Sequence, residues 1–93
     1  MIENTSDVLK ALAHPVRIQI LKQLYDGPIC VCHINENIDY SQANISKHLK
    51  ILKNAHIVKS TKEGMYQYYS LKDEKIKEII RLAEEVVKNS KIR

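Results

Sequence analysis

The groups with the most distinctive chemistry in this 93-residue sequence are two cysteines separated by one residue, Cys30 and Cys32. Thiolates are soft ligands that select As(III), Cd(II), Pb(II), Cu(I) or Zn(II) over hard cations. The start of a helix stabilises a thiolate, so a pair at that position is also reactive. The pair therefore indicates a soft-metal site. Thiol redox chemistry and simple burial of two small apolar groups are the alternatives.

A helix with one apolar and one polar face is predicted from Ser41 to about Asn54. Ile45, Leu49 and Leu52 recur at the i, i+4, i+7 spacing that stacks side chains on one face, and Ser41 is a favourable N-cap. The other positions carry hydroxyl, amide and ammonium groups, which pair with base edges and phosphates in a DNA major groove. The predicted DNA contacts are Ser41, Gln42, Asn44, Ser46, Lys47, Lys50 and, farther along the chain, Lys62.

The distribution of charge supports a polyanionic partner. The formal net charge is +4, and the segment from Ser41 to Lys62 contains five lysines and no acidic residue. A solvated lysine face is the alternative interpretation of such a run. Double-stranded DNA is favoured because the lysines coincide with the two-faced helix.

Residues that start and stop helices predict three helices before this one. Asn4, Thr5 or Ser6 can cap a helix over about residues 5–13, and an Asp-Gly-Pro sequence ends the second helix. His14 serves as the next cap and Pro15 opens that second helix. A short third helix is predicted over about residues 29–37.

After the helix predicted from Ser41 to about Asn54, the helical spacing of apolar residues ends. Residues 57–61 and 65–71 are rich in β-branched and aromatic side chains, and residues 62–64 join them with a glycine, so a β-hairpin is predicted. Helical spacing returns over about residues 73–88. This order of elements is that of a winged helix-turn-helix, a mainly α fold with a small β-hairpin.

The length predicts one domain over residues 1–93. The helix-turn-helix occupies about residues 29–54 and the wing about 57–71. The apolar faces of helices 5–13 and 73–88 predict a homodimer, whose two-fold symmetry sets two recognition helices roughly 34–36 Å apart on DNA. Closure of the domain's own core by the last helix is the alternative.

Three motifs in this order resemble the ArsR/SmtB family of metal- and redox-responsive repressors. The first two motifs are LAHPVRIQIL at 12–21 and SQANISKHLKIL at 41–52. The third lies in segment 58–71 and consists of Val-Lys at 58–59, Glu-Gly at 63–64 and Tyr-Tyr-Ser-Leu at 68–71. The resemblance covers about residues 5–88. It implies a homodimeric repressor that binds a palindromic operator and leaves it when an inducer binds.

The resemblance also places Cys30 and Cys32 where arsenic-, cadmium- and lead-responsive members carry Cys-Val-Cys, at the start of the third helix. The implied inducer is a soft metal or metalloid ion bound by both thiolates, with His33 as a possible further ligand and no metal required for folding. Asn35 stands where arsenic-responsive relatives often have a third cysteine. A redox or persulfide sensor is the alternative, because some members sense oxidants through paired cysteines.

A regular helix sets residues i and i+2 about 200° apart around its axis. Both sulfurs therefore cannot face one ion if the helix runs through Cys30 and Cys32. We expect chelation to unwind the first turn of that helix.

Several classes of protein are disfavoured by the sequence. It has no apolar run near 18 residues and no basic-then-apolar leader, which argues against membrane insertion and secretion and favours reduced thiols in the cytoplasm. A thiol-disulfide enzyme is a remote alternative, since neither a nearby base nor a substrate cleft is indicated. A protein-interaction module that uses the last helix is another.

Overall fold

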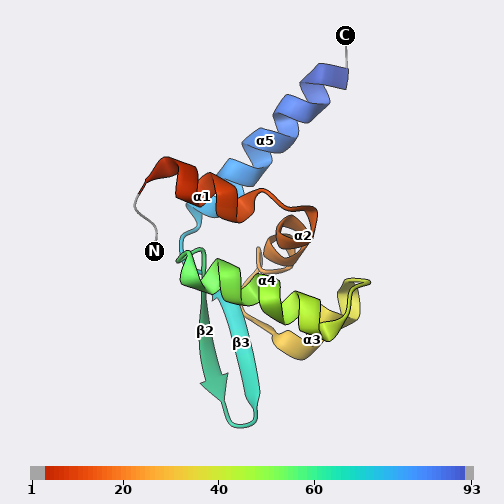
Figure 1. Cartoon of the computed structure of the whole chain (residues 1–93), viewed down its shortest axis with the longest axis vertical. Helices are drawn as coiled ribbons and strands as arrows, with labels where there is room; N and C mark the ends of the chain where they lie inside the picture. The colour runs from red at the N-terminus through yellow and green to blue at the C-terminus, as the bar shows by residue number, and fades with distance from the viewer. Residues whose placement is uncertain (1–3, 92–93) are drawn as a thin grey trace.

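The computed structural model describes residues 4–91, which form five helices and a small three-stranded sheet (Figure 1). In chain order the elements are α1 (Thr5–Leu12), α2 (Pro15–Gln23), β1 (Ile29–Cys30), α3 (Val31–Asn37), α4 (Gln42–Asn54), β2 (Val58–Glu63), β3 (Tyr66–Leu71) and α5 (Lys75–Lys91). This is the predicted winged helix-turn-helix order, with one short strand added before α3.

Side-chain caps start three of the helices at the predicted places. Asn4 Oδ1 accepts a hydrogen bond from the N–H three residues ahead at 3.1 Å. His14 Nδ1 accepts one from the Val16 N–H at 3.1 Å. Ser41 Oγ accepts one from the Asn44 N–H at 3.2 Å. Each bond satisfies a donor that the helix itself leaves without a partner.

The core lies between α2, α3 and α4, and the base of the hairpin and the first half of α5 close it. The predicted inward residues of α4 are confirmed, since Ile45, Leu49 and Leu52 are at most 1% exposed. The other buried side chains include Val16, Ile20, Leu21, Leu24, Ile34, Ile57, Val58, Leu71, Ile76 and Ile80. Burial of α4 along one face fixes which of its side chains remain on the surface.

The prediction of a helix over residues 29–37 is wrong at its first two residues. Ile29 and Cys30 form β1, which pairs antiparallel with β3 in the strand order β1-β3-β2. In this register Ile29 pairs with Tyr69 and Cys30 with Tyr68, and α3 begins only at Val31. The residues of β3 that pair with Ile29 and Cys30 lie about forty positions farther along the chain. The local sequence pattern therefore did not indicate a strand here.

The hairpin turn is also shorter than predicted. Lys62 and Glu63 belong to β2 and pair with Gln67 and Tyr66 of β3. Gly64, with a φ of +62°, occupies the turn, where a residue without a Cβ adopts this conformation at no steric cost. The β2 strand therefore continues two residues beyond residues 57–61, the segment that its aromatic and β-branched content predicted.

The last helix, α5, begins and ends slightly later than the predicted residues 73–88. Asp73 Oδ1 accepts a hydrogen bond from the Lys75 N–H at 2.9 Å, next to the start of the helix. Figure 1 shows the C-terminal half of α5 and the tip of the β2–β3 hairpin projecting from opposite ends of the molecule. Both are therefore accessible to partners.

The end of α4 is formed by a Schellman motif whose left-handed residue is a histidine. The Ile57 N–H donates to the Leu52 carbonyl and the His56 N–H to the Lys53 carbonyl, each at 3.0 Å. His56 has a φ of +60°, a conformation that costs a residue with a Cβ about 1–2 kcal/mol.

Replacing His56 by glycine is therefore expected to stabilise the protein by about 1 kcal/mol, because glycine removes this backbone strain. Urea unfolding at fixed protein concentration measures the change. His33→Gly is the matched control, since the same substitution inside α3 is expected to destabilise by about 1 kcal/mol. Equal destabilisation by both variants would contradict the strain at His56.

Candidate nucleic-acid interface and thiol pair

The surface of α4 carries the predicted polar set. Gln42, Asn44, Ser46, Lys47 and Lys50 are exposed, on a helix whose opposite face is buried in the core. Ser41 is exposed too, although its hydroxyl is already engaged as the N-cap. The structure thus gathers these side chains on one rigid element, with free amide, hydroxyl and ammonium groups facing outward.

The β2–β3 hairpin is a second surface element held in a fixed relation to α4. At its base Val58 is 2% and Leu71 7% exposed, so the hairpin is anchored in the core. Lys62 is exposed near its tip, in β2 rather than in the predicted turn. Met65 is 91% exposed, although the sequence pattern placed it in a strand. The hairpin therefore packs against α4 at its base and presents a cation and an apolar side chain at its projecting end.

The two cysteines lie close together, contrary to the separation expected for a regular helix. Cys30 ends β1 and is the N-cap of α3, with extended backbone angles of φ −64° and ψ 140°. Its Sγ lies 2.8 Å from the Sγ of Cys32, and no disulfide joins them. The expectation that chelation must unwind the first turn is therefore wrong, because only Cys32 is helical.

The two thiols are electrostatically distinct. Cys30 is buried, at 4% exposed, whereas Cys32 is exposed. The hydrogen bond between the two sulfurs lowers the pKa of the Cys30 thiol, burial opposes this, and the backbone N–H groups of Cys32 and His33 lower the pKa further. The same bond, burial and the Cys30 charge raise the pKa of Cys32. The contact between the two sulfurs therefore stabilises a single thiolate in the pair.

The donor set fits a soft ion held in a bent geometry. Two sulfurs, each about 2.3 Å from a tetrahedral ion, are separated by roughly 3.7 Å, whereas linear binding needs roughly 4.6 Å. The observed 2.8 Å requires a small opening for the former and a larger one for the latter. His33 is exposed, and the described residues contain no group of three or more His, Cys, Asp or Glu side chains arranged around an ion.

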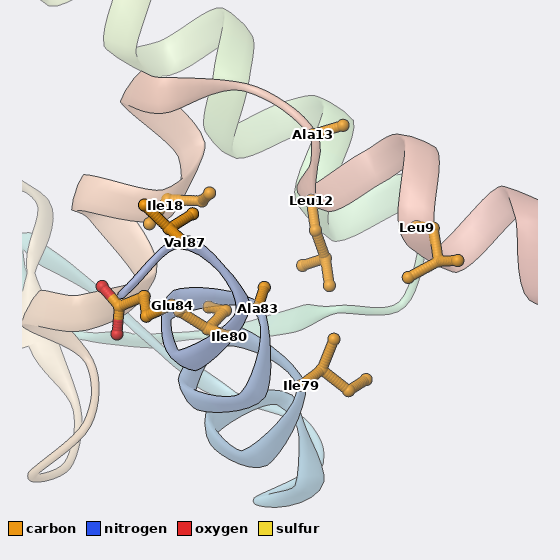
Figure 2. A pocket seen from close by; sticks show the side chains of 9 residues that line it. All are labelled: Leu9, Leu12, Ala13, Ile18, Ile79, Ile80, Ala83, Glu84 and Val87. Atoms are coloured by element: carbon orange, nitrogen blue, oxygen red, sulfur yellow. The ribbon is translucent and has the colours of Figure 1, made fainter. Parts of the chain in front are cut away.

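An apolar groove runs between the two helices predicted to dimerise (Figure 2). Its volume is about 400 Å³, and it is lined by Leu9, Leu12, Ala13, Ile18, Ile79, Ile80, Ala83, Glu84 and Val87. Figure 2 shows α1 side chains on one side and α5 side chains on the other. Leu9 and Val87 are 51% and 55% exposed, and Leu82 and Val86 extend the apolar surface along α5.

Comparison with known proteins identifies the family. The profile described as "Bacterial regulatory protein, arsR family" matches residues 14–60. A helix-turn-helix-type transcriptional regulator of Methanocaldococcus jannaschii is 44% identical over 85 residues, which are 90% of this chain and 96% of that protein. The chain belongs to the ArsR family. The match extends well beyond the helix-turn-helix, so the wing and the terminal helices share the relationship.

Two further ArsR-type comparisons bear on the site and the fold. A homolog of the cadmium resistance transcriptional regulatory protein CadC from Staphylococcus aureus is 41% identical over 81 residues, 86% of this chain and 67% of that protein. The homodimeric winged helix-turn-helix DNA-binding domain of a possible ArsR-family regulator from Mycobacterium bovis superposes with a TM-score of 0.80. It is 30% identical, over 91% of this chain and 79% of that one. The chain is thus a DNA-binding transcriptional regulator by family.

Enzymatic function is disfavoured within this family, because the matched relatives are transcriptional regulators. Over residues 4–91, no helix combines the length and apolar character needed to cross a membrane.

Proposed function

We propose that this ArsR-family chain is a homodimeric repressor that binds a palindromic operator through α4 and the wing. A soft metal or metalloid ion at Cys30 and Cys32 releases it. The observation that carries the proposal is the outward set of amide, hydroxyl and ammonium groups on α4, whose other face is fixed in the core.

Recognition by α4 divides between two kinds of contact. Gln42 and Asn44 have amides that pair bidentately with adenine edges, and Ser46 has a hydroxyl that donates or accepts. Lys47 and Lys50 neutralise phosphate, as does Lys62 of the wing, so operator affinity falls steeply with salt. The absence of acidic residues from 41–62 keeps this surface attractive to DNA.

These roles predict different losses for two exposed side chains of α4. Gln42→Ala is expected to lose about 1–3 kcal/mol of discrimination between operator and random DNA, because a base contact disappears. Lys50→Ala is expected to weaken both complexes equally and to lower the salt slope by about 1. Fluorescence anisotropy at several salt concentrations measures both. If Gln42→Ala left both affinities untouched, α4 would not be the recognition helix.

Dimerisation through the apolar groove gives the symmetry that a palindrome requires. A second copy that covers α1 and α5 buries Leu9, Leu82, Val86 and Val87, which are more than half exposed in one protomer. Two-fold pairing presents two α4 helices to successive major grooves. The homodimeric state of the similar Mycobacterium bovis domain supports a dimer.

A ligand at the thiol pair acts on the wing through the sheet. Cys30 lies in β1, where it pairs with Tyr68 of β3, the same strand that carries the wing. A chelated ion ties Cys30 to Cys32 at a sulfur separation wider than the present 2.8 Å. The signal proposed is a displacement of Cys30 that weakens the β1–β3 pairing, so that binding at the thiols disfavours the wing position that contacts DNA.

Thiol redox sensing is the second candidate, and the short Sγ–Sγ distance together with the lowered pKa of Cys30 favours it. The thiolate of the pair attacks the outer sulfur of an organic persulfide, RSSH; the S–S bond breaks, the alkylthiolate leaves, and the attacking cysteine becomes a persulfide. The second cysteine then attacks the protein sulfur of that persulfide, which forms the Cys30–Cys32 disulfide and releases hydrosulfide. Release from DNA by persulfide but not by As(III), Cd(II) or Pb(II) would select this candidate over metal sensing.

A further inference from the structure

A cluster of three side chains, His14, Arg17 and His48, joins the start of α2 to the recognition helix. Arg17 Nε donates a hydrogen bond to His48 Nδ1 at 3.2 Å. The rings of His14 and His48 lie with their centroids 4.4 Å apart at an interplanar angle of 47°. All three side chains are half-buried. His48 thus faces protein on α4, although its neighbour Lys47 faces solvent.

Arg17 also reaches the end of α1. Its Nη1 donates to the carbonyl of Ala11 at 3.2 Å and to that of Lys10 at 3.4 Å. The same turn of α1 places Leu12 in the apolar groove. One guanidinium therefore connects three helices: the helix beside the proposed dimer interface, its own helix and the recognition helix.

The bond between Arg17 and His48 depends on the charge of the histidine. A guanidinium has donors and no acceptor, so His48 Nδ1 must carry a lone pair. Protonated imidazole has no acceptor nitrogen and repels the guanidinium. Protonation of His48 therefore converts a contact that orients α4 into a repulsive one.

We propose that Arg17 is a positioning residue for operator recognition. Arg17 holds α4 in a fixed orientation relative to the dimer interface only while His48 is neutral. Operator selectivity should then fall in mild acid. The proposal rests on the proposed DNA-binding function and concerns the orientation of α4, since Arg17 lies beneath α4 rather than among its exposed side chains.

The surrounding charges set the direction of the pH dependence. His14 and Arg17 from the start of α2 and Lys47 from α4 itself act on His48, while α1 contributes the Lys10 and Ala11 carbonyls to the other end of Arg17. Burial lowers the pKa of His48 below its ordinary value of 6.5, and electrostatic interactions with His14, Arg17 and Lys47 lower it further. The neutral form therefore prevails at pH 7.5, and the contact is lost as pH falls through the lowered pKa.

The test is the ratio of operator to random-DNA affinity between pH 5 and pH 8, at constant ionic strength and with reduced protein. The operator is a palindrome selected from random duplexes by this protein. His48→Gln keeps an acceptor for Arg17 without a titrating ring. His56→Asn is the matched control, because it removes an exposed histidine just beyond the C-terminal end of α4 and suits the left-handed backbone.

The wild-type ratio is expected to fall at least fivefold on acidification, and the same fall is expected for His56→Asn. For His48→Gln the ratio should stay within twofold. Arg17→Lys should lower it severalfold at pH 7.5, because a lysine cannot form the same fork of bonds. A flat wild-type ratio, or an equal fall in His48→Gln, would overturn the proposal while leaving DNA binding intact. Absence of DNA binding at every pH would instead refute the proposed function.

A measurement on the wild-type protein avoids any variant that fails to fold. Nitrogen NMR of the His48 ring at pH 7.5 is expected to show the proton on Nε2 and a lone pair on Nδ1. A proton on Nδ1 would overturn the proposal, because that nitrogen then cannot accept from Arg17.

Discussion

Arsenite in a buffer that contains a monothiol is expected to weaken operator binding by about 5- to 150-fold, and the Cys30→Ser/Cys32→Ser variant is expected to change less than twofold. The two protein thiolates and one buffer thiol complete three sulfur ligands around As(III). Serine keeps the shape of cysteine but offers a hard hydroxyl, which binds soft ions poorly. Fluorescence anisotropy of labelled operator measures the release.

The same titration tests whether the thiols act on the wing through the β1–β3 pairing. Of the Tyr68 and Tyr69 amides, hydrogen exchange at the one that donates to β1 is expected to accelerate when As(III) binds, because β3 pairs with β1 at these residues. Cys32→Ser is a useful intermediate variant, since it keeps the buried Cys30 in β1 and removes the exposed thiol. Undiminished release from the double-serine variant would exclude the thiol pair as the sensor.

Ala83→Glu is expected to convert the dimer to a monomer and to weaken operator binding by at least about 100-fold. Ala83 is exposed in one protomer and lines the apolar groove, so the substitution leaves the protomer core intact. In the proposed dimer the carboxylate loses its hydration against apolar side chains, which is strongly unfavourable. Light scattering after size-exclusion chromatography measures the mass.

Lys88→Gln is the matched control for the groove. Lys88 is exposed on α5, it lies outside the groove lining and away from the stripe of Leu82 and Val86, and its replacement changes the charge by the same amount. The control is expected to remain dimeric and to bind operator like the wild type. A dimeric Ala83→Glu protein would show that the two copies meet elsewhere.

Local sequence signals predicted most of the helices because their causes are local. The caps at Asn4, His14 and Ser41 accept bonds from N–H groups two or three residues away, and the buried stripe of α4 follows from a spacing within one helix. Such signals act within one or two turns. They were sufficient to give the winged helix-turn-helix order.

Pairing between distant segments accounts for the predictions that were wrong. Cys30 adopts a strand because Tyr68 supplies its partner, and that pairing also turns its sulfur toward Cys32. The contact between Arg17 and His48 spans 31 positions, and no local pattern marks either residue as its partner. The DNA contacts on α4 remain predictions, since exposure on a helix is necessary for them but does not identify a base.

The most direct test is to titrate the selected palindrome and a random duplex of equal length with reduced protein, and to measure affinity and stoichiometry together. We expect two protomers per palindrome, a preference of at least about a thousandfold over the random duplex, and release by a soft ion. Equal affinity for both duplexes, or one protomer per palindrome, would contradict a dimeric sequence-specific repressor.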